Sequence, residues 1–228
     1  EYFKAGDKVM GITRFGAYTS HINIAEDYVV PLIETWSFEQ GAGYLVQGLT
    51  AYYGLVYLGN IQKGESVLIH SAAGGVGLLA NRIAKKHNAY TIGTVGNPEK
   101  LALLKDEGYN QGIVRDKDFR QKLKNALGGR DLNIIMECIG GEIFMDGYKT
   151  LAPQGRLINY GSARYGGRGN SPNWLRLAWL YLTRPKIDPQ KMIESNKSIM
   201  GFNLIWLYNK KELMDQILQE MKELKLDP

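Results

Sequence analysis

The chain has 228 residues, of which 44% are hydrophobic and 22% are charged. This balance is typical of a globular protein with one large domain, or one domain and part of a second, and it excludes a collagen, a coiled-coil rod and an acidic disordered tail. No run of about 18 uncharged apolar residues occurs, so we expect no membrane-spanning helix. The one cysteine, Cys138, leaves no partner for an internal disulfide and excludes a cysteine-rich zinc site.

The net charge of +5 is concentrated in one stretch of the sequence. Nine basic and two acidic residues lie between Arg164 and Lys211, a net charge of +7. Such a stretch fits a nucleic acid, an anionic membrane, a phosphorylated ligand or an ordinary solvated surface. No five basic residues occur in succession, so we expect no nucleic-acid partner. The single cysteine favours a reducing, cytoplasmic location, and the start at Glu1 rather than at a methionine suggests a fragment.

The first 36 residues are punctuated by glycine and predict short β-strands at 8–11, 17–24 and 28–32. These strands are too short to form a core of their own. A capping box, in which Ser37 precedes Gln40 by three positions, then opens a helix that runs to about residue 58 with a break near Gly48.

From residue 66 onward, short apolar runs alternate with helical patterns. The first run, at 66–70, has no polar alternation, which is typical of a strand buried on both faces of a parallel sheet. We expect further strands at 90–95, 112–114, 132–138 and 156–160, and helices at 74–86, 98–108, 119–127 and 143–151. This alternation predicts an α/β fold with a doubly wound parallel sheet, the Rossmann fold.

After Gly161 the pattern changes. Residues 172–195 predict a helical insertion with an apolar helix at 174–182, followed by a strand at 198–207 and a last helix that opens near Asn209. We therefore assign residues 1–36 to the end of one domain and residues 37–228 to the Rossmann domain.

The turn at 71–77 follows the buried strand and carries the pattern G-x-G-x-x-G, with Ala72, Gly74 and Gly77 at its three small positions. Ala72 permits the tight turn, Gly74 lets a diphosphate approach the backbone, and Gly77 lets the helix pack closely on the strand. Free amides at the helix start would hold the phosphates. A purely structural turn is the alternative. The residues expected to bind the coenzyme here are Ala72, Ala73, Gly74, Gly75, Val76 and Gly77.

The segment after the second strand bears on the choice of coenzyme. NAD enzymes usually carry an acid about 20 residues after the glycine turn, where it bonds the ribose 2′-hydroxyl. Here the strand ends at Val95 and Gly96 without an acid, and Lys100 follows, which is able to pair with a 2′-phosphate. We expect NADPH, with Gly96, Lys100 and, after the third strand, Arg115 near its adenosine. A solvated helix residue is the alternative interpretation of Lys100.

A set of short motifs resembles those of the zinc-free quinone oxidoreductases of the medium-chain dehydrogenase/reductase superfamily, in the same order. The motifs are Gly6-Asp7-Lys8-Val9, Gly16-Ala17-Tyr18, Gln47-Gly48-Leu49-Thr50-Ala51-Tyr52-Tyr53, the turn at 72–77, Gly93-Thr94-Val95 and Tyr160-Gly161. The stretch at 173–204 is most similar to the branch of the synaptic-vesicle membrane proteins, also called vesicle amine transport proteins.

This resemblance implies that residues 1–36 end a GroES-like catalytic domain and that the protein transfers hydride, without zinc, from NADPH to a quinone or an α,β-unsaturated carbonyl. It also implies a homodimer in which edge strands pair. Family segments on both sides of this chain are missing, so we expect the fragment to be inactive by itself. The residues that would contact the nicotinamide side are Thr50, Cys138, Gly140, Tyr160, Gly161, Ser162 and Phe202. Thr50 and Tyr160 are the candidate catalytic residues, with local packing as the alternative.

We expect no metal. The four-cysteine loop of zinc-dependent relatives would fall at 10–15, which contains no cysteine, and their last catalytic zinc ligand would fall near Val46 or Gln47, neither of which is a usual ligand. His70, like the other two histidines, lies at no metal-ligand spacing, and we interpret it as structural.

The apolar helix at 174–182 permits a second interpretation. Arg176 and Arg184 flank an apolar face, and such a helix would lie in a membrane interface. The protein would then be a coenzyme-binding, membrane-associated module with little turnover. A helix buried on the Rossmann domain or at a subunit contact is the alternative. The face consists of Trp174, Leu177, Ala178, Tyr181 and Leu182.

Overall fold

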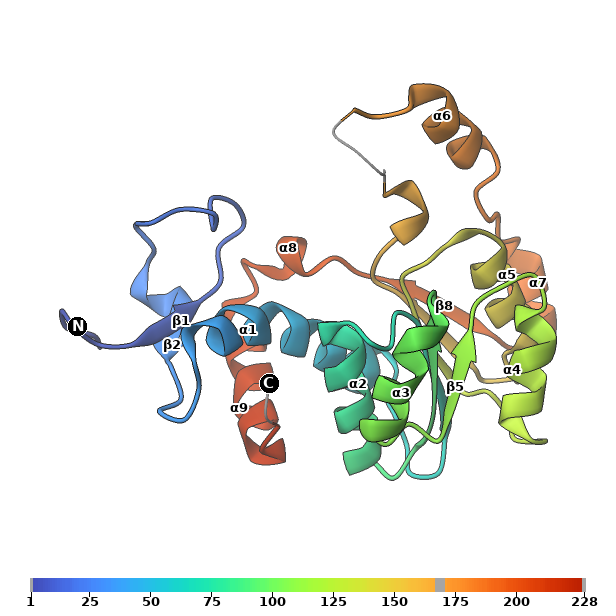
Figure 1. Ribbon diagram of the computed structural model, residues 1–228, viewed down its shortest axis with the longest axis horizontal. Helices are drawn as coiled ribbons and strands as arrows, with labels where there is room; N and C mark the ends of the chain where they lie inside the picture. Colours follow the sequence, from blue (N-terminus) through green and yellow to red (C-terminus); the bar gives the residue numbers. More distant parts are fainter. Residues whose placement is uncertain (1, 167–170, 227–228) are drawn as a thin grey trace.

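The computed structural model describes residues 2–166 and 171–226. Its centre is a six-stranded parallel sheet in the order β5-β4-β3-β6-β7-β8 (Figure 1). The strands are β3 (Ser66–Ile69), β4 (Tyr90–Val95), β5 (Gln111–Val114), β6 (Ile134–Glu137), β7 (Arg156–Asn159) and β8 (Ser198–Gly201). The strand order reverses beside β3, so the sheet is doubly wound and the predicted α/β Rossmann fold is confirmed. Residues 167–170 of the basic stretch lie outside the described residues.

Separate sets of helices cover the two faces of the sheet. The helices between the strands are α2 (Gly75–Lys86), α3 (Leu101–Asp106, after a 3-10 turn at Pro98–Lys100), α4 (Phe119–Leu127) and α5 (Gly141–Thr150). Val67 and Ile69 of β3 pack in the core that contains the α2 side chains, whereas Leu68 packs in the core that contains those of α4 and α5. Burial on both faces explains why this strand is apolar without alternation.

Helix α1 (Phe38–Tyr52) begins at the predicted capping box: the Ser37 Oγ accepts from the Gln40 N–H at 3.2 Å, and the Gln40 Oε1 accepts from the Ser37 N–H at 2.8 Å. The predicted break near Gly48 is wrong, because α1 continues through it and passes into a π-helical segment, Tyr53–Leu58. Gly48 serves close packing instead, since a Cβ there would lie 2.4 Å from the Met221 Cε.

The N-terminal part forms a two-stranded antiparallel sheet apart from the central one. It consists of β1 (Val9–Gly11) and β2 (Val29–Pro31), joined by a segment that contains a 3-10 turn at Glu26–Tyr28. The predicted strand at 17–24 is wrong, because those residues are almost all exposed and pair with no strand among the described residues.

The C-terminal part departs from the prediction at two places. The expected strand at 198–207 ends at Gly201, and α8 (Leu204–Leu207) follows, because the Asn203 Oδ1 accepts from the Ile205 N–H at 3.2 Å and starts a helix. The last helix, α9 (Lys211–Leu224), begins after Lys210, so the predicted cap at Asn209 is also wrong. Helix α9 packs on α1 through Met221.

The insertion contains α6 (Trp174–Leu182), α7 (Pro189–Ser195) and, before the undescribed residues, a 3-10 turn at Ala163–Tyr165. Helix α6 extends away from the sheet (Figure 1), and none of its residues is buried. The alternative that α6 is buried on its own Rossmann domain is therefore wrong. Among the described residues, no helix is both long and apolar enough to cross a membrane.

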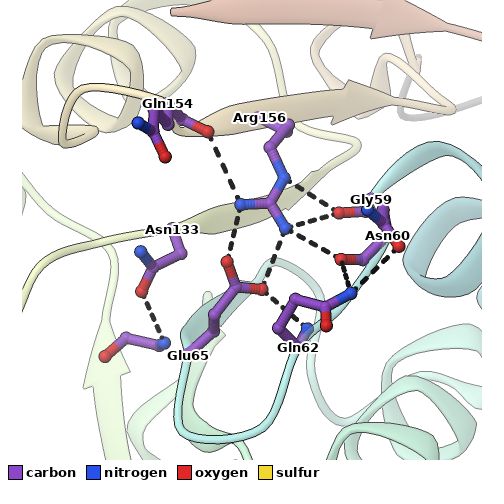
Figure 2. A network of polar contacts seen from close by, with 8 residues as sticks. Gly59, Asn60, Gln62, Glu65, Asn133, Gln154 and Arg156 are labelled. Atoms are coloured by element: carbon purple, nitrogen blue, oxygen red, sulfur yellow. Dashed lines mark hydrogen bonds and ion pairs between the residues drawn. The ribbon is translucent and has the colours of Figure 1, made fainter.

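Arg156 joins three segments at the edge of the sheet where the strands begin (Figure 2). Its Nη1 and Nη2 donate to the two carboxylate oxygens of Glu65 at 2.7 and 2.9 Å, and its Nε donates to the Gly59 carbonyl at 2.8 Å. This contact fixes the end of the π-helical segment against the start of β3 and of β7. The glycine turn lies at the opposite end of the sheet, where the strands end.

Candidate functional site

The glycine turn connects β3 to α2 with its backbone close to the strand. A Cβ on Gly77 would lie 2.6 Å from the Ala72 Cα, so the contact between helix and strand requires glycine at this position. A Cβ on Gly74 would meet only the Ser71 carbonyl oxygen, at 3.2 Å, so the space beside Gly74 is open. The first turn of α2 carries no acidic side chain. Its unpaired amides and positive dipole end are therefore available to an anion.

Gln47 of α1 lies over the start of α2, a contact that no pattern in the sequence signals. Its Oε1 would lie 1.8 Å from a Cβ on Gly75. The carboxamide therefore rests on the backbone of Gly75, and a ligand that reaches this amide meets Gln47.

Arg115, the residue after β5, lies against the end of β4, the strand after which NAD enzymes usually carry an acid. Its Nη1 donates to the carbonyl and to the Oγ1 of Thr94 at 3.0 and 2.8 Å, and its Nη2 would lie 3.3 Å from a Cβ on Gly96. Burial lowers the pKa of this guanidinium, against the effect of nearby Cys138 and Glu137. Lys100 is exposed at the end of the 3-10 turn that follows β4.

Four of the predicted residues line one cleft of about 340 Å³, which we call the Tyr160 cleft. They are Thr50, Val76, Tyr160 and Phe202. The edge of the Phe202 ring packs on Tyr53 at 5.0 Å between ring centroids. The described lining contains no Asp, Glu, His or Cys side chain. The described lining therefore offers an apolar, aromatic surface, hydroxyl groups, the Asn203 carboxamide and the Arg14 guanidinium, rather than a carboxylate acid or base.

The two candidate catalytic hydroxyls differ in what they can do. The Thr50 Oγ1 donates to the Val46 carbonyl of its own helix at 2.7 Å. Burial, followed by the nearby Cys138, raises the pKa of Tyr160 well above its ordinary value. Tyr160 is therefore a neutral phenol at neutral pH, able to donate a hydrogen bond but not to act as a base.

A second cavity of about 200 Å³ brings together Gly140, Gly161 and Ser162. Gly140 has a φ of +85°, and a Cβ there would lie 3.2 Å from the Ser162 Oγ. Cys138 contacts Ser71 of the glycine turn at 3.4 Å from Sγ to Oγ. Burial raises the pKa of the Cys138 thiol, so it stays protonated at neutral pH.

Two buried polar side chains lie beneath the turn, and the sequence singled out neither as part of a site. His70 and Glu137 are both fully buried, with 3.2 Å between Nε2 and Oε2. Burial, followed by the charge of Arg115, lowers the pKa of His70 to about 3, so the imidazole is neutral. Burial raises the pKa of Glu137.

The zinc-binding dehydrogenase family matches residues 75–223 of this chain. The chain belongs to this family. The synaptic vesicle membrane protein VAT-1 homolog of Danio rerio is 30% identical to it over 222 residues, which cover 97% of this chain and 46% of the relative. Quinone oxidoreductase 1 of Escherichia coli (strain K12) is 34% identical over 191 residues, which cover 82% of this chain and 58% of the relative. The predicted resemblance to the quinone oxidoreductases, in the VAT-1 branch, is thereby confirmed.

A solved structure shows the same fold. The quinone oxidoreductase of Thermus thermophilus, solved also in complex with NADPH, superposes with a TM-score of 0.78 at 24% identity, over 95% of this chain and 64% of that one. The chain spans about half the length of the curated relatives it matches.

The described residues of this chain do not form a zinc site, although the name of the family refers to zinc. In the described part of the chain, no three His, Cys, Asp or Glu side chains lie close enough to hold a metal ion. The positions where a relative's last ligand would fall are Val46, which is exposed, and Gln47, whose carboxamide covers Gly75. We derive no step through a metal.

Proposed function

We propose that this chain binds NADPH and forms part of an enzyme that transfers hydride to a quinone or an α,β-unsaturated carbonyl. The observation that carries the proposal is the end of β4, where Arg115 lies against Gly96 and the strand itself ends without an acid, the first acid being Glu99 in the 3-10 turn that follows. Relatives that are quinone oxidoreductases support the reaction class. The family's chemistry is supplied by the bound coenzyme, which donates hydride from its nicotinamide ring.

The chain's own residues would bind and orient this coenzyme. The amides that open α2 would hold its diphosphate over Gly74, and Arg115 and Lys100 would pair with its 2′-phosphate. Cys138, Gly140, Gly161 and Ser162 would line the path of its ribose. These assignments stay predictions.

The Tyr160 cleft would hold the nicotinamide and the substrate. Its aromatic surface, from Tyr160, Phe202 and Tyr208, suits a flat conjugated molecule. A quinone or an enone accepts hydride at carbon and spreads the resulting charge onto oxygen, where the neutral Tyr160 phenol is able to donate a hydrogen bond. We place the small-molecule substrate here.

Calorimetric titration of the chain with NADPH and with NADH tests the proposal. A contact between a charged side chain and the 2′-phosphate contributes about 1.5–3 kcal/mol, so we expect NADPH to bind roughly 10- to 150-fold more tightly. Equal affinities would contradict the choice of NADPH, and binding of neither coenzyme would contradict the proposed function as a whole.

A membrane-associated role is the second candidate, and the exposure of α6 favours it. Trp174 and Trp179 are 74% and 66% exposed, and Arg176 lies on the same helix. Flotation with anionic liposomes, repeated with Trp174→Asp and Trp179→Asp, tests this role. We expect the chain to float and the two variants to remain behind; a chain that never floats excludes the membrane.

The remaining assignments are also proposals. Residues 1–36 would end a GroES-like catalytic domain, β8 would pair with its copy in a homodimer, and the protein would work in the cytoplasm. The exposed edge of β8 supports the second of these, because β8 is the last strand of the described sheet.

A further inference from the structure

A continuous line of polar contacts crosses the sheet beneath the glycine turn. The Arg115 Nη1 donates to the Thr94 Oγ1 at 2.8 Å, and that oxygen lies 2.8 Å from the His70 Nδ1. The His70 Nε2 lies 3.2 Å from the Glu137 Oε2. These residues come from the carboxyl ends of β4, β3 and β6 and from the residue after β5, which are neighbours in the sheet.

The line ends on the backbone of the loop after β6. The Glu137 Oε1 accepts from the Ile139 N–H at 2.5 Å and from the Gly140 N–H at 2.7 Å. Gly140 then adopts a φ of +85°, and α5 begins at Gly141. One carboxylate oxygen therefore binds two amides at the point where the chain turns away from β6. The same loop contains Cys138 and Gly140, two of the predicted coenzyme contacts.

The other carboxylate oxygen of Glu137, Oε2, faces His70. The Oε2 and the His70 Nε2 lie 3.2 Å apart without the geometry of a hydrogen bond, neither has another polar partner among the described residues, and both side chains are fully buried. A Thr94 hydroxyl that accepts from Arg115 is able to donate its hydrogen to the His70 Nδ1, and we adopt this arrangement. The neutral imidazole then carries its hydrogen on Nε2, facing Glu137. A buried polar pair favours the arrangement in which both groups are satisfied, because any other leaves a group without a partner.

We propose that Glu137 is a positioning residue, which holds the loop at 138–140 in the shape that receives the nicotinamide half of the coenzyme, and that His70 holds Glu137 in place. This inference rests on the proposed function. Glu137 would touch neither coenzyme nor substrate, and its effect would reach them through the two loop amides. The adenosine half, bound at the far end of β4, would not depend on it.

Amide hydrogen exchange of the chain without coenzyme tests the hold on the loop. By NMR, we expect the Ile139 and Gly140 amides to be protected in the wild type and exposed in Glu137→Met, while β6 keeps its protection. Glu137→Gln restores protection, because its carboxamide oxygen accepts the same two bonds, and its NH2 group donates to the His70 Nε2 once the imidazole hydrogen moves to Nδ1, where the Thr94 oxygen accepts it. Ile135→Val, a buried change on the same strand, is the matched control and leaves the loop protected. Thermal unfolding of each variant verifies that it is folded.

Binding of two probes then tests the consequence for the coenzyme. Glu137→Met is expected to weaken NADPH binding by about tenfold or more, the loss that a charged hydrogen bond accounts for. Adenosine 2′,5′-bisphosphate, which lacks the nicotinamide half, is expected to bind within about twofold of the wild type. The Gln variant is expected to bind both probes normally.

The outcomes separate the inference from the proposed function. Unprotected Ile139 and Gly140 amides in the wild type overturn the inference without any variant, as does equal weakening of both probes in Glu137→Met. A wild type that binds neither probe overturns the proposed function and, with it, the role of Glu137 toward the coenzyme. Protection that depends on Glu137, together with selective loss of NADPH binding, supports the inference.

Discussion

At the scale of single residues, the same chemical group plays different parts according to its surroundings. His70 follows an apolar strand and has no charged neighbour in sequence, yet in the fold it becomes a neutral imidazole between Thr94 and Glu137. Arg115 is an ordinary cation in the sequence, and the fold bends it back onto Thr94 beside Gly96. Neither environment is visible in the local sequence, because both are made by residues from neighbouring strands.

The charge of Lys100 is expected to select the coenzyme. Lys100→Glu should weaken NADPH binding by roughly tenfold or more and leave NADH binding within about twofold, because only NADPH brings a 2′-phosphate. Calorimetry measures both affinities. Lys105→Glu makes the same change of charge at an exposed position on α3 and should alter neither. Equal losses for both coenzymes in Lys100→Glu would show that the lysine has no part in this choice.

The buried His70 is expected to make stability depend on pH. Its pKa is about 3 in the folded chain against an ordinary 6.5, so between these values the unfolded chain binds a proton that the folded chain does not. The free energy of unfolding should therefore fall as pH falls from 6.5, by up to about 1.4 kcal/mol per pH unit. Above pH 4.5, the raised pKa of Glu137 has the opposite effect on the free energy of unfolding.

The variant His70→Gln separates these two effects. Urea unfolding at pH 7.5 and pH 5.5 should show that the wild type loses stability relative to this variant, by about 1 kcal/mol. His87→Gln, a change at a less buried histidine, serves as the comparison. Parallel pH dependence in the wild type and His70→Gln would mean that His70 is not held neutral.

At the scale of elements, the two ends of the sheet have separate tasks. The strands begin at the contact between Arg156 and Glu65, whose side chains are only 17% and 15% exposed. They end at the glycine turn and at the loops after β4 and β6. Helix α1 links the two ends of the sheet. It carries Gln47 and Thr50 at the site, and it continues into the π-helical segment, which is followed by Gly59 and its contact with Arg156.

Arg156→Met is expected to lower the free energy of unfolding by about 3 kcal/mol, because it leaves the Glu65 carboxylate and the carbonyls of Gly59, Asn60 and Gln154 without their donor. Coenzyme affinity should stay unchanged, since the contact lies at the far edge of the sheet. Chemical unfolding and calorimetry measure the two. Lys122→Gln breaks an ion pair with Asp116 that is 42% exposed on both sides and should leave the free energy of unfolding nearly unchanged. Similar losses for the two variants would contradict the role of Arg156.

At the scale of the whole molecule, the described sheet ends in two edge strands, β5 and β8. Helix α3 follows β4 and lies beside β5, the edge strand at one end of the sheet. Strand β8 is the edge strand at the other end. The Ser198 and Phe202 amides donate to the Gly155 and Asn159 carbonyls next to β7. By alternation along the strand, the Ile199 amide points outward, where a second copy would pair with it.

Ile199→Pro should therefore convert a dimer to a monomer without loss of the fold, because proline removes an outward amide and none that bonds β7. Light scattering after gel filtration measures the mass, and circular dichroism verifies the fold. Ile199→Thr keeps the amide and should remain a dimer. A proline variant that is still a dimer would place the contact between copies elsewhere.

The sequence predicted the repeating part of the fold well. The strand at 90–95 and the helices at 119–127 and 174–182 have the predicted bounds, because each is specified by its own apolar pattern and by the glycines, prolines or caps beside it. The glycine turn and the basic residues after β4 were also found in the sequence, since these motifs lie within short segments. Errors occurred at Gly48 and at 17–24, where contacts with distant segments decide, and at 202–207, where the Asn203 side chain starts a short helix.

The amino-acid sequence by itself determined the order of strands and helices, the family and the segments that would bind a coenzyme, because neighbouring residues encode these through periodicity and turn chemistry. Only the tertiary structure decided that Gly48 makes room for Met221, that α6 stands exposed, and that Gln47 covers Gly75. It also placed Glu137 under the loop it holds. The physical reason is that burial and hydrogen bonding depend on which distant segments meet, and no local pattern records that.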